Sequence, residues 1–147
     1  MFTLPWPPSV NHYWRHCRGR TFISQEGQAF RTSVCALLAG GGPRKPPAGG
    51  RIALCMDAFP PDRRARDLDN LAKAVQDALG THTDTTRGRQ VVVPGVYESD
   101  CQIDLLVLRR QAPAPGGHAN VSIGTWPGTR CPLCGGTPGA GVGFYLN

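Results

Sequence analysis

Apolar residues recur at strand and helix spacing through the first half of the chain. Phe2–Trp6 predicts a short strand that ends at two prolines. Ser24 is a suitable N-cap, and apolar positions from Phe30 to Leu38 follow it at helical spacing until a run of three glycines. Arg51–Phe59 has an apolar residue at every second position, which predicts a second strand.

The next segment has helical periodicity and a polar face. Leu68–Leu79 carries an apolar stripe, and either Asp67 or Asp69 is placed to cap the predicted helix before it stops at a glycine. On the opposite face Asp69, Lys73 and Asp77 form one row at i, i+4 spacing. The predicted helix therefore buries its apolar face and presents the charged row to solvent.

The remaining segments complete a small mixed domain. Gly80–Arg89 predicts a solvated loop, Cys101–Arg109 a buried central strand, and Asn120–Trp126 an edge strand. The order β-α-β-α-β, with one further strand, indicates an α/β (α+β) fold with a small mixed sheet and two main helices. We expect one domain over residues 1–126 and a poorly ordered, Gly- and Cys-rich tail over 127–147.

Composition and charge narrow the classes of function. The chain has 147 residues and a net charge of +6, with no apolar run long enough to cross a membrane and no signal-peptide pattern at the start. Residues 1–66 hold ten Lys/Arg against three Asp/Glu, whereas residues 67–147 hold six against seven. A basic half that leads into an acidic motif suits a polyanionic substrate and a metal.

The acidic motif is Asp67-Leu68-Asp69-Asn70-Leu71, with Lys73 two residues later and three arginines just before it. Two carboxylates about 4 Å apart repel by about 1 kcal/mol in water and more near a protein surface, so a cation between them is favourable. Oxygen ligands suit Mg²⁺ or Mn²⁺. Helix capping explains one aspartate and an ordinary salt bridge explains Lys73, but together the motif points to metal-dependent phosphodiester chemistry.

A third carboxylate would complete such a metal site. The candidates are Asp84, Glu98, Asp100 and Asp104. Asp100 is the best choice because it stands directly before the most apolar strand, where it can point back towards the helix N-terminus. Asp104 would lie within that strand, where a charge is costly unless the strand is at an edge.

Six cysteines are scattered along the chain, and Cys35 and Cys55 fall in apolar segments as small core residues. Cys131 and Cys134 have ligand spacing, but a structural zinc site needs four ligands and no second pair exists. Zinc there, completed by His118 or by a partner subunit, is the less favoured alternative.

Three blocks of sequence resemble the RusA-type Holliday junction resolvases over most of residues 2–126. The blocks are Thr3–Ser9 with Asn11, Tyr13, Arg15–His16, Arg18–Thr21 and Ser24–Arg31; then Pro61–Arg64, Arg66–Leu71, Lys73–Ala74 and Asp77–Leu79; then Gly95–Val96, Asp100 and Gln102–Ile103. The resemblance implies a small α/β homodimer that nicks four-way DNA junctions in pairs, with Mg²⁺ or Mn²⁺. It also implies a cytoplasmic protein of bacterial or phage origin that acts in recombination and repair.

Residue roles follow from the resemblance. The essential aspartates match Asp67, Asp69 and Asp100, which would hold the metal, and the essential lysine matches Lys73. Arg66 matches an arginine tied to DNA handling. The basic residues expected to hold DNA phosphates without reading sequence are Arg15, Arg18, Arg20, Arg63, Arg64 and Arg66.

Two departures from the family pattern keep an alternative open. Ser99 stands where relatives usually have an acid, and the connection between Leu79 and Asp100 is roughly a dozen residues longer than expected. The alternatives are a nuclease for flaps or forks and a non-catalytic protein that binds branched DNA.

Overall fold

A four-stranded mixed sheet forms one layer of the molecule. The computed structural model describes residues 1–17, 19–41, 45–86 and 89–126. The sheet has the order β1-β8-β4-β7, in which β4 and β7 are parallel and the other pairs are antiparallel. Its strands are β1 (Phe2–Pro5), β4 (Ile52–Phe59), β7 (Ile103–Arg110) and β8 (His118–Thr125).

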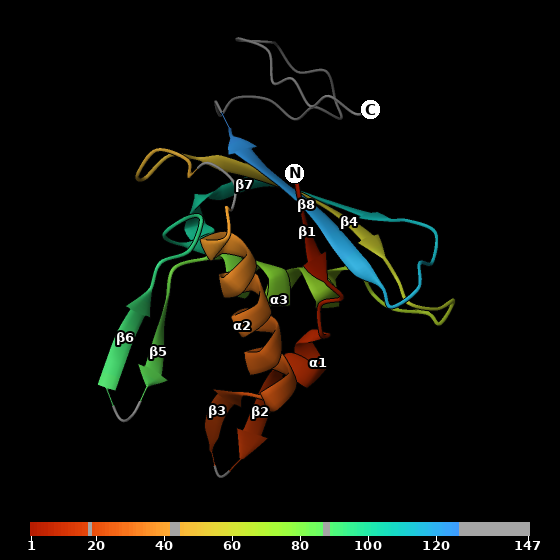
Figure 1. Ribbon diagram of the computed structural model, residues 1–147, viewed down its shortest axis with the longest axis horizontal. Coiled ribbons are helices and arrows are strands. Elements are labelled where there is room, and N and C mark those ends of the chain that lie inside the picture. Colours follow the sequence, from red (N-terminus) through yellow and green to blue (C-terminus); the bar gives the residue numbers. More distant parts are fainter. Residues whose placement is uncertain (18, 42–44, 87–88, 127–147) are drawn as a thin grey trace.

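Helices cover one face of this sheet, and two hairpins project from the helical layer (Figure 1). The helices are α1 (Val10–Tyr13), α2 (Gln25–Ala39), α3 (Asp69–Leu79) and the short 3-10 helix η1 (Asp100–Gln102). The hairpins pair β2 (Trp14–Cys17) with β3 (Arg20–Ile23), and β5 (His82–Thr86) with β6 (Arg89–Val93). In the described part of the chain, no helix is long and apolar enough to span a membrane.

The predicted α2, β4 and α3 are confirmed, and each follows from local sequence. The Ser24 hydroxyl accepts the Gly27 N–H at 3.0 Å and so caps α2. Alternate residues of β4, among them Leu54 and Met56, are buried against the helices. The buried face of α3 includes Leu71 and Val75, at the i, i+4 spacing that the sequence predicts.

Three predictions about the elements are wrong. β7 lies at an edge of the sheet and β8 lies inside it, so their predicted places are exchanged. Neither Asp67 nor Asp69 caps α3, because Leu68 occupies the N-cap position and no side chain makes the capping bond there. The expected loop after α3 contains the β5–β6 hairpin. The predicted tail, residues 127–147, lies outside the described residues.

Candidate active site

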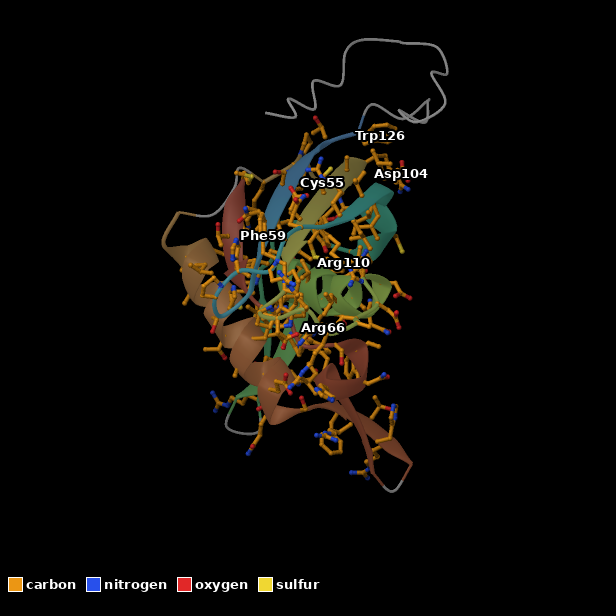
Figure 2. The ribbon with its side chains drawn as sticks, turned by 90° about the vertical axis from the view of Figure 1, so that its right-hand side faces the viewer. Cys55, Phe59, Arg66, Asp104, Arg110 and Trp126 are labelled. Carbon is orange, nitrogen blue, oxygen red and sulfur yellow. The ribbon has the colours of Figure 1, made fainter. Side chains whose placement is uncertain are left out.

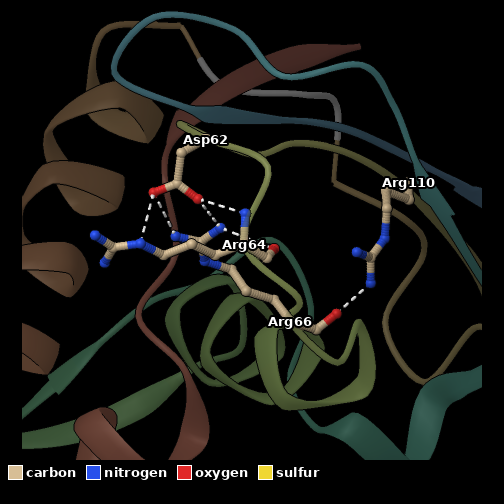
Figure 3. A network of polar contacts seen from close by, with 4 residues as sticks. All are labelled: Asp62, Arg64, Arg66 and Arg110. Carbon is tan, nitrogen blue, oxygen red and sulfur yellow. Dashed lines mark hydrogen bonds and ion pairs between the residues drawn. The ribbon is translucent and has the colours of Figure 1, made fainter.

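Asp62 organises the loop between β4 and α3. Its carboxylate accepts two hydrogen bonds from the Arg66 guanidinium, Nη1 to Oδ1 at 2.6 Å and Nη2 to Oδ2 at 3.0 Å. The Arg64 backbone N–H donates to the same Oδ1 at 2.9 Å (Figure 3). These hydrogen bonds lower the pKa of Asp62 to about 2, and those from Arg66 have the largest effect. The loop is therefore closed around one ionised side chain directly before the acidic motif.

Arg66 is held on several sides. Its guanidinium lies over the Trp6 ring, 5.7 Å from the centroid, and its carbonyl accepts a hydrogen bond from the Arg110 side chain. Figure 2 shows Arg66 and Arg110 near one another beneath the sheet. The Arg66 side chain is only 24% exposed, whereas that of Arg64 is 84% exposed. A phosphate contact by Arg66 must therefore compete with Asp62.

The two carboxylates at the start of α3 face solvent. Asp67 and Asp69 are both exposed, and the Asn70 amide donates to Asp67 Oδ2 at 3.3 Å. Since neither aspartate caps the helix, capping does not account for the pair. Asp69 lies in the first turn, where the helix dipole favours a negative charge. The pair offers oxygen atoms of the kind that Mg²⁺ and Mn²⁺ prefer.

Lys73 bridges two further carboxylates. Its Nζ lies 2.7 Å from Asp77 Oδ1 and 2.6 Å from Asp100 Oδ2. Burial lowers the pKa of Lys73, but the hydrogen bonds to Asp100 and Asp77 outweigh it, so that the pKa is raised overall. The ammonium is therefore held in its charged form, one turn after Asp69.

Asp100 is positioned by the turn that precedes β7. Ser99 caps η1, with its hydroxyl accepting the Cys101 N–H at 3.3 Å, and the Gln102 side-chain oxygen accepts the N–H of Glu98 at 2.7 Å. The Gln102 amide donates to the Gly50 carbonyl at 2.9 Å and fixes the turn to the loop before β4. Ser99 thus caps the turn that carries Asp100.

The described residues do not gather the three predicted metal ligands. No group of three His, Cys, Asp or Glu side chains within them is arranged to hold a metal ion. Asp100 is paired with Lys73, towards the middle of α3, while Asp67 and Asp69 stand at its beginning. The chemistry of the donor set fits a hard divalent ion, but a site with all three requires Asp100 to exchange its lysine partner.

Two other third-carboxylate candidates lie elsewhere. Asp104 lies near the beginning of β7 and pairs with Arg51, Nε to Oδ2 at 2.7 Å; Figure 2 shows it beside Trp126, away from Arg66. Asp84 lies in the β5–β6 hairpin. Of the four candidates considered, Asp100 is the one that contacts Lys73.

Sequence reasoning missed the buried polar side chains behind Lys73. Tyr13 is fully buried, and burial raises its pKa to about 12, with Asp77 and Lys73 among the charges that act on it. The Tyr97 hydroxyl donates to the Gln76 carbonyl at 2.8 Å. Asp62 and Asp77 also belong to the site. The i, i+4 row of the predicted helix included Asp77, but no pattern in the sequence indicated the role of Asp62.

The predicted DNA-binding arginines lie on two exposed segments. Arg15 and Arg20 are exposed on the β2–β3 hairpin, and Arg63 and Arg64 are exposed on the loop before α3. Arg18 lies outside the described residues.

Comparison with known proteins identifies the family. The family model described as endodeoxyribonuclease RusA matches residues 5–118, which contain all of the predicted site residues. This chain belongs to the RusA family. The resemblance expected from the three sequence blocks is thereby confirmed, and the mixed α and β architecture is compatible with it.

Individual RusA proteins match at about half of the aligned positions. The crossover junction endodeoxyribonuclease RusA of Enterobacteria phage 82 is 51% identical over 81 residues, and that of Escherichia coli K12 is 48% identical over 81 residues. Each alignment covers 52% of this chain and 63% of the relative, so the chain spans less than two thirds of these relatives' length. Cys131 and Cys134 lie beyond both the RusA match and the described residues, so the zinc alternative stays a prediction.

Proposed function

We propose that this chain is a metal-dependent, structure-specific endodeoxyribonuclease that resolves four-way DNA junctions by paired nicks. The observation that carries the proposal is the solvent-facing pair Asp67 and Asp69, neither of which caps α3. Lys73, one turn after Asp69, binds Asp100. Membership of the RusA family supports the choice of substrate. Its relatives come from a phage and from bacteria, and a cytoplasmic location in such a host is part of the proposal.

The residues divide the chemistry among them. Asp67, Asp69 and Asp100 would hold Mg²⁺ or Mn²⁺, which when bound polarises the scissile phosphate and lowers the pKa of water. Lys73, kept protonated by its carboxylate partners, neutralises charge that develops on the phosphoryl oxygens. Asp77, whose Oδ1 lies 2.7 Å from Lys73 Nζ, would remain as the partner of the lysine once Asp100 binds the metal. Arg63 and Arg64 hold flanking phosphates from the loop.

Paired nicking implies a two-fold assembly. A four-way junction presents two equivalent strands, and a symmetric homodimer presents two equivalent sites to them. The homodimer is therefore part of the proposal, and sedimentation of the protein alone and with a junction tests it. A monomer in both states would contradict paired nicking by one assembly.

Cleavage of a labelled synthetic four-way junction tests the enzyme claim. We expect symmetric nicks with Mg²⁺ or Mn²⁺, none with EDTA, and a loss of about a hundredfold or more in the Asp69→Asn variant. Asp104→Asn makes the same chemical change at an aspartate paired with Arg51 and is expected to cleave like the unmodified protein. Cleavage that persists in EDTA or in Asp69→Asn would overturn the proposed mechanism.

One observation favours a second candidate, a protein that binds branched DNA without cutting it. Asp100 is paired with Lys73, and the described residues contain no three-carboxylate group. Tight junction binding without nicks, in Mn²⁺ as well as Mg²⁺, would establish this candidate in place of the nuclease.

A further inference from the structure

The β2–β3 hairpin has two different faces. Its register pairs Trp14 with Ile23, Arg15 with Phe22, and His16 with Thr21. Because side chains alternate along a strand, Trp14, His16, Thr21 and Ile23 share one face, and Arg15 and Phe22 share the other. Arg20, two residues before Phe22, lies on this second face as well.

At the base of the hairpin the first face is held against the protein through Trp14 and Ile23, whereas His16 and Thr21 nearer the tip are exposed. The Trp14 ring meets the Tyr13 ring edge-on, with centroids 5.3 Å apart, and Ile23 packs against the core. His16 Nδ1 lies 2.9 Å from the Thr21 hydroxyl, across the two strands. The first face is therefore partly buried at Trp14 and Ile23, whereas Arg15, Arg20 and Phe22 of the second face are all exposed.

The second face combines an exposed aromatic ring with unpaired positive charge. Phe22 is 48% exposed, and Arg15 and Arg20 are both exposed. Within the residues that the structure describes, neither arginine forms an ion pair. A lone exposed hydrophobic residue is ordinary on a protein surface. Its place between two free arginines is what distinguishes Phe22.

The hairpin is also fixed next to the candidate active site. Tyr13, directly before β2, is buried where Lys73 and Asp77 act on it electrostatically. At the other end, the Ser24 N–H donates to the Tyr13 carbonyl at 2.9 Å and closes the base of the hairpin. The contact with α2 is so close that a Cβ on Gly27 would lie 2.9 Å from the Tyr13 carbonyl oxygen. Figure 1 shows the hairpin projecting from this base, away from the sheet.

We propose that Phe22 stacks on an unpaired base at the branch point of the DNA while Arg15 and Arg20 hold the adjoining phosphates. This inference rests on the proposed function and names the residue that selects branched over linear DNA. Aromatic side chains stack on bases of any sequence, and neighbouring cations track the backbone. In a linear duplex the bases are stacked on each other, so Phe22 gains a partner only where the stack is interrupted.

Binding of a four-way junction and of a linear duplex of the same sequence tests the inference, in Ca²⁺ in place of Mg²⁺ to prevent cleavage. A 2-aminopurine at the branch point reports unstacking through its fluorescence. Phe22→Ala is expected to weaken junction binding about tenfold, to leave duplex binding within about twofold, and to remove the fluorescence change. Phe22→Trp keeps a stacking surface, so its junction binding, its duplex binding and its fluorescence change are expected to equal those of the unmodified protein.

Leu37→Ala is the matched control, because Leu37 is also 48% exposed but lies on α2. It is expected to behave like the unmodified protein. Junction binding unchanged in Phe22→Ala, or lost equally for the junction and the duplex, would overturn the role of Phe22 and leave the nuclease proposal standing. An unmodified protein that does not prefer the junction to the duplex would overturn both.

Discussion

At the scale of single residues, the loop before α3 shows how an arginine in a basic cluster can serve the protein instead of the ligand. Arg63, Arg64 and Arg66 look equivalent in sequence, yet Arg66 alone forms a two-pronged contact with Asp62 and lies over Trp6. The planar guanidinium allows both contacts at once. Arg66 therefore places the acidic motif. Arg64 makes only a longer contact, from its Nε to Asp62 Oδ2 at 3.8 Å, and the side chains of Arg63 and Arg64 remain exposed to DNA.

Replacing Arg66 by lysine tests this division. Lysine keeps the charge but loses the fork and the ring contact, so we expect the free energy of unfolding to fall. Arg64→Lys makes the same change at a side chain that is 84% exposed and is expected to have no measurable effect. Urea denaturation of both variants measures the difference, and equal stabilities would contradict the structural role of Arg66.

Tyr13 gives a prediction about pH. Burial raises its pKa from 10.0 to about 12, so the unfolded chain loses the phenolic proton before the folded protein does. The resulting stabilisation is fully present below pH 10 and is lost as the pH rises towards 12. Tyr13→Phe cannot ionise, and we expect its stability to fall less than that of the unmodified protein between pH 10 and 12.

The same variant is informative at neutral pH. The Tyr13 hydroxyl is buried and finds no hydrogen-bond partner among the described protein atoms. Removing an unsatisfied buried hydroxyl is expected to leave the free energy of unfolding unchanged or to raise it by about 1 kcal/mol. Equilibrium unfolding at pH 7 measures it, and a loss larger than about 1 kcal/mol would show that the hydroxyl is hydrogen-bonded in solution.

At the scale of elements, the β5–β6 hairpin contributes none of its described residues to the hydrophobic core. The chain enters and leaves it at adjacent points, because the Val96 N–H donates to the Leu79 carbonyl at 2.7 Å and the Thr81 N–H to the Tyr97 carbonyl at 2.8 Å. A Cβ on Gly95 would lie 2.3 Å from the Leu79 carbonyl oxygen, so this crossing requires glycine. Val92 on the hairpin is 65% exposed, which is typical of an element that contributes little to the core.

Replacing residues 82–94 by a two-residue turn is therefore expected to leave the fold and junction cleavage intact. The junction-cleavage rate should stay within about threefold and the free energy of unfolding within about 1 kcal/mol, since the core residues are untouched. Cleavage assays and urea denaturation measure both. As a control, Gly95→Ala in the full chain should destabilise the protein strongly, because the added methyl group meets backbone. A deletion that abolishes folding would show that the fold depends on the hairpin.

The sequence predicts which segments form helices and strands better than it predicts which strands lie side by side. The Ser24 cap and the alternation in β4 are local, and both are confirmed. The places of β7 and β8 are not local: an apolar strand can be half-buried at an edge, and nothing in its own sequence names its partner. The site divides in the same way. The i, i+4 contact of Lys73 with Asp77 follows from helix spacing, but the contact with Asp100 depends on the turn capped by Ser99.

At the scale of the whole molecule, the arginines of the described residues fall into two groups. Arg15 and Arg20 of the β2–β3 hairpin, and Arg63 and Arg64 of the loop before α3, are exposed near the candidate site, whereas others are neutralised by partners on the sheet. Arg109 pairs with Asp57 at 2.5 Å, and Arg51 pairs with Asp104. The net charge of +6 therefore does not describe how charge is distributed, because exposed arginines near the site can meet DNA whereas those paired on the sheet are already neutralised.

The dependence of junction binding on salt separates these two groups. Each phosphate neutralised by the protein contributes about 0.9 to the slope of log K against log salt, so the loss of one contact lowers the slope by about 1. We expect this change in Arg63→Gln and none in Arg51→Gln, although both remove one positive charge. Binding isotherms between about 50 and 200 mM salt measure the slopes. Equal slopes in the two variants would mean that DNA responds to the net charge of the molecule, and the loop before α3 would lose its place in the DNA-binding surface.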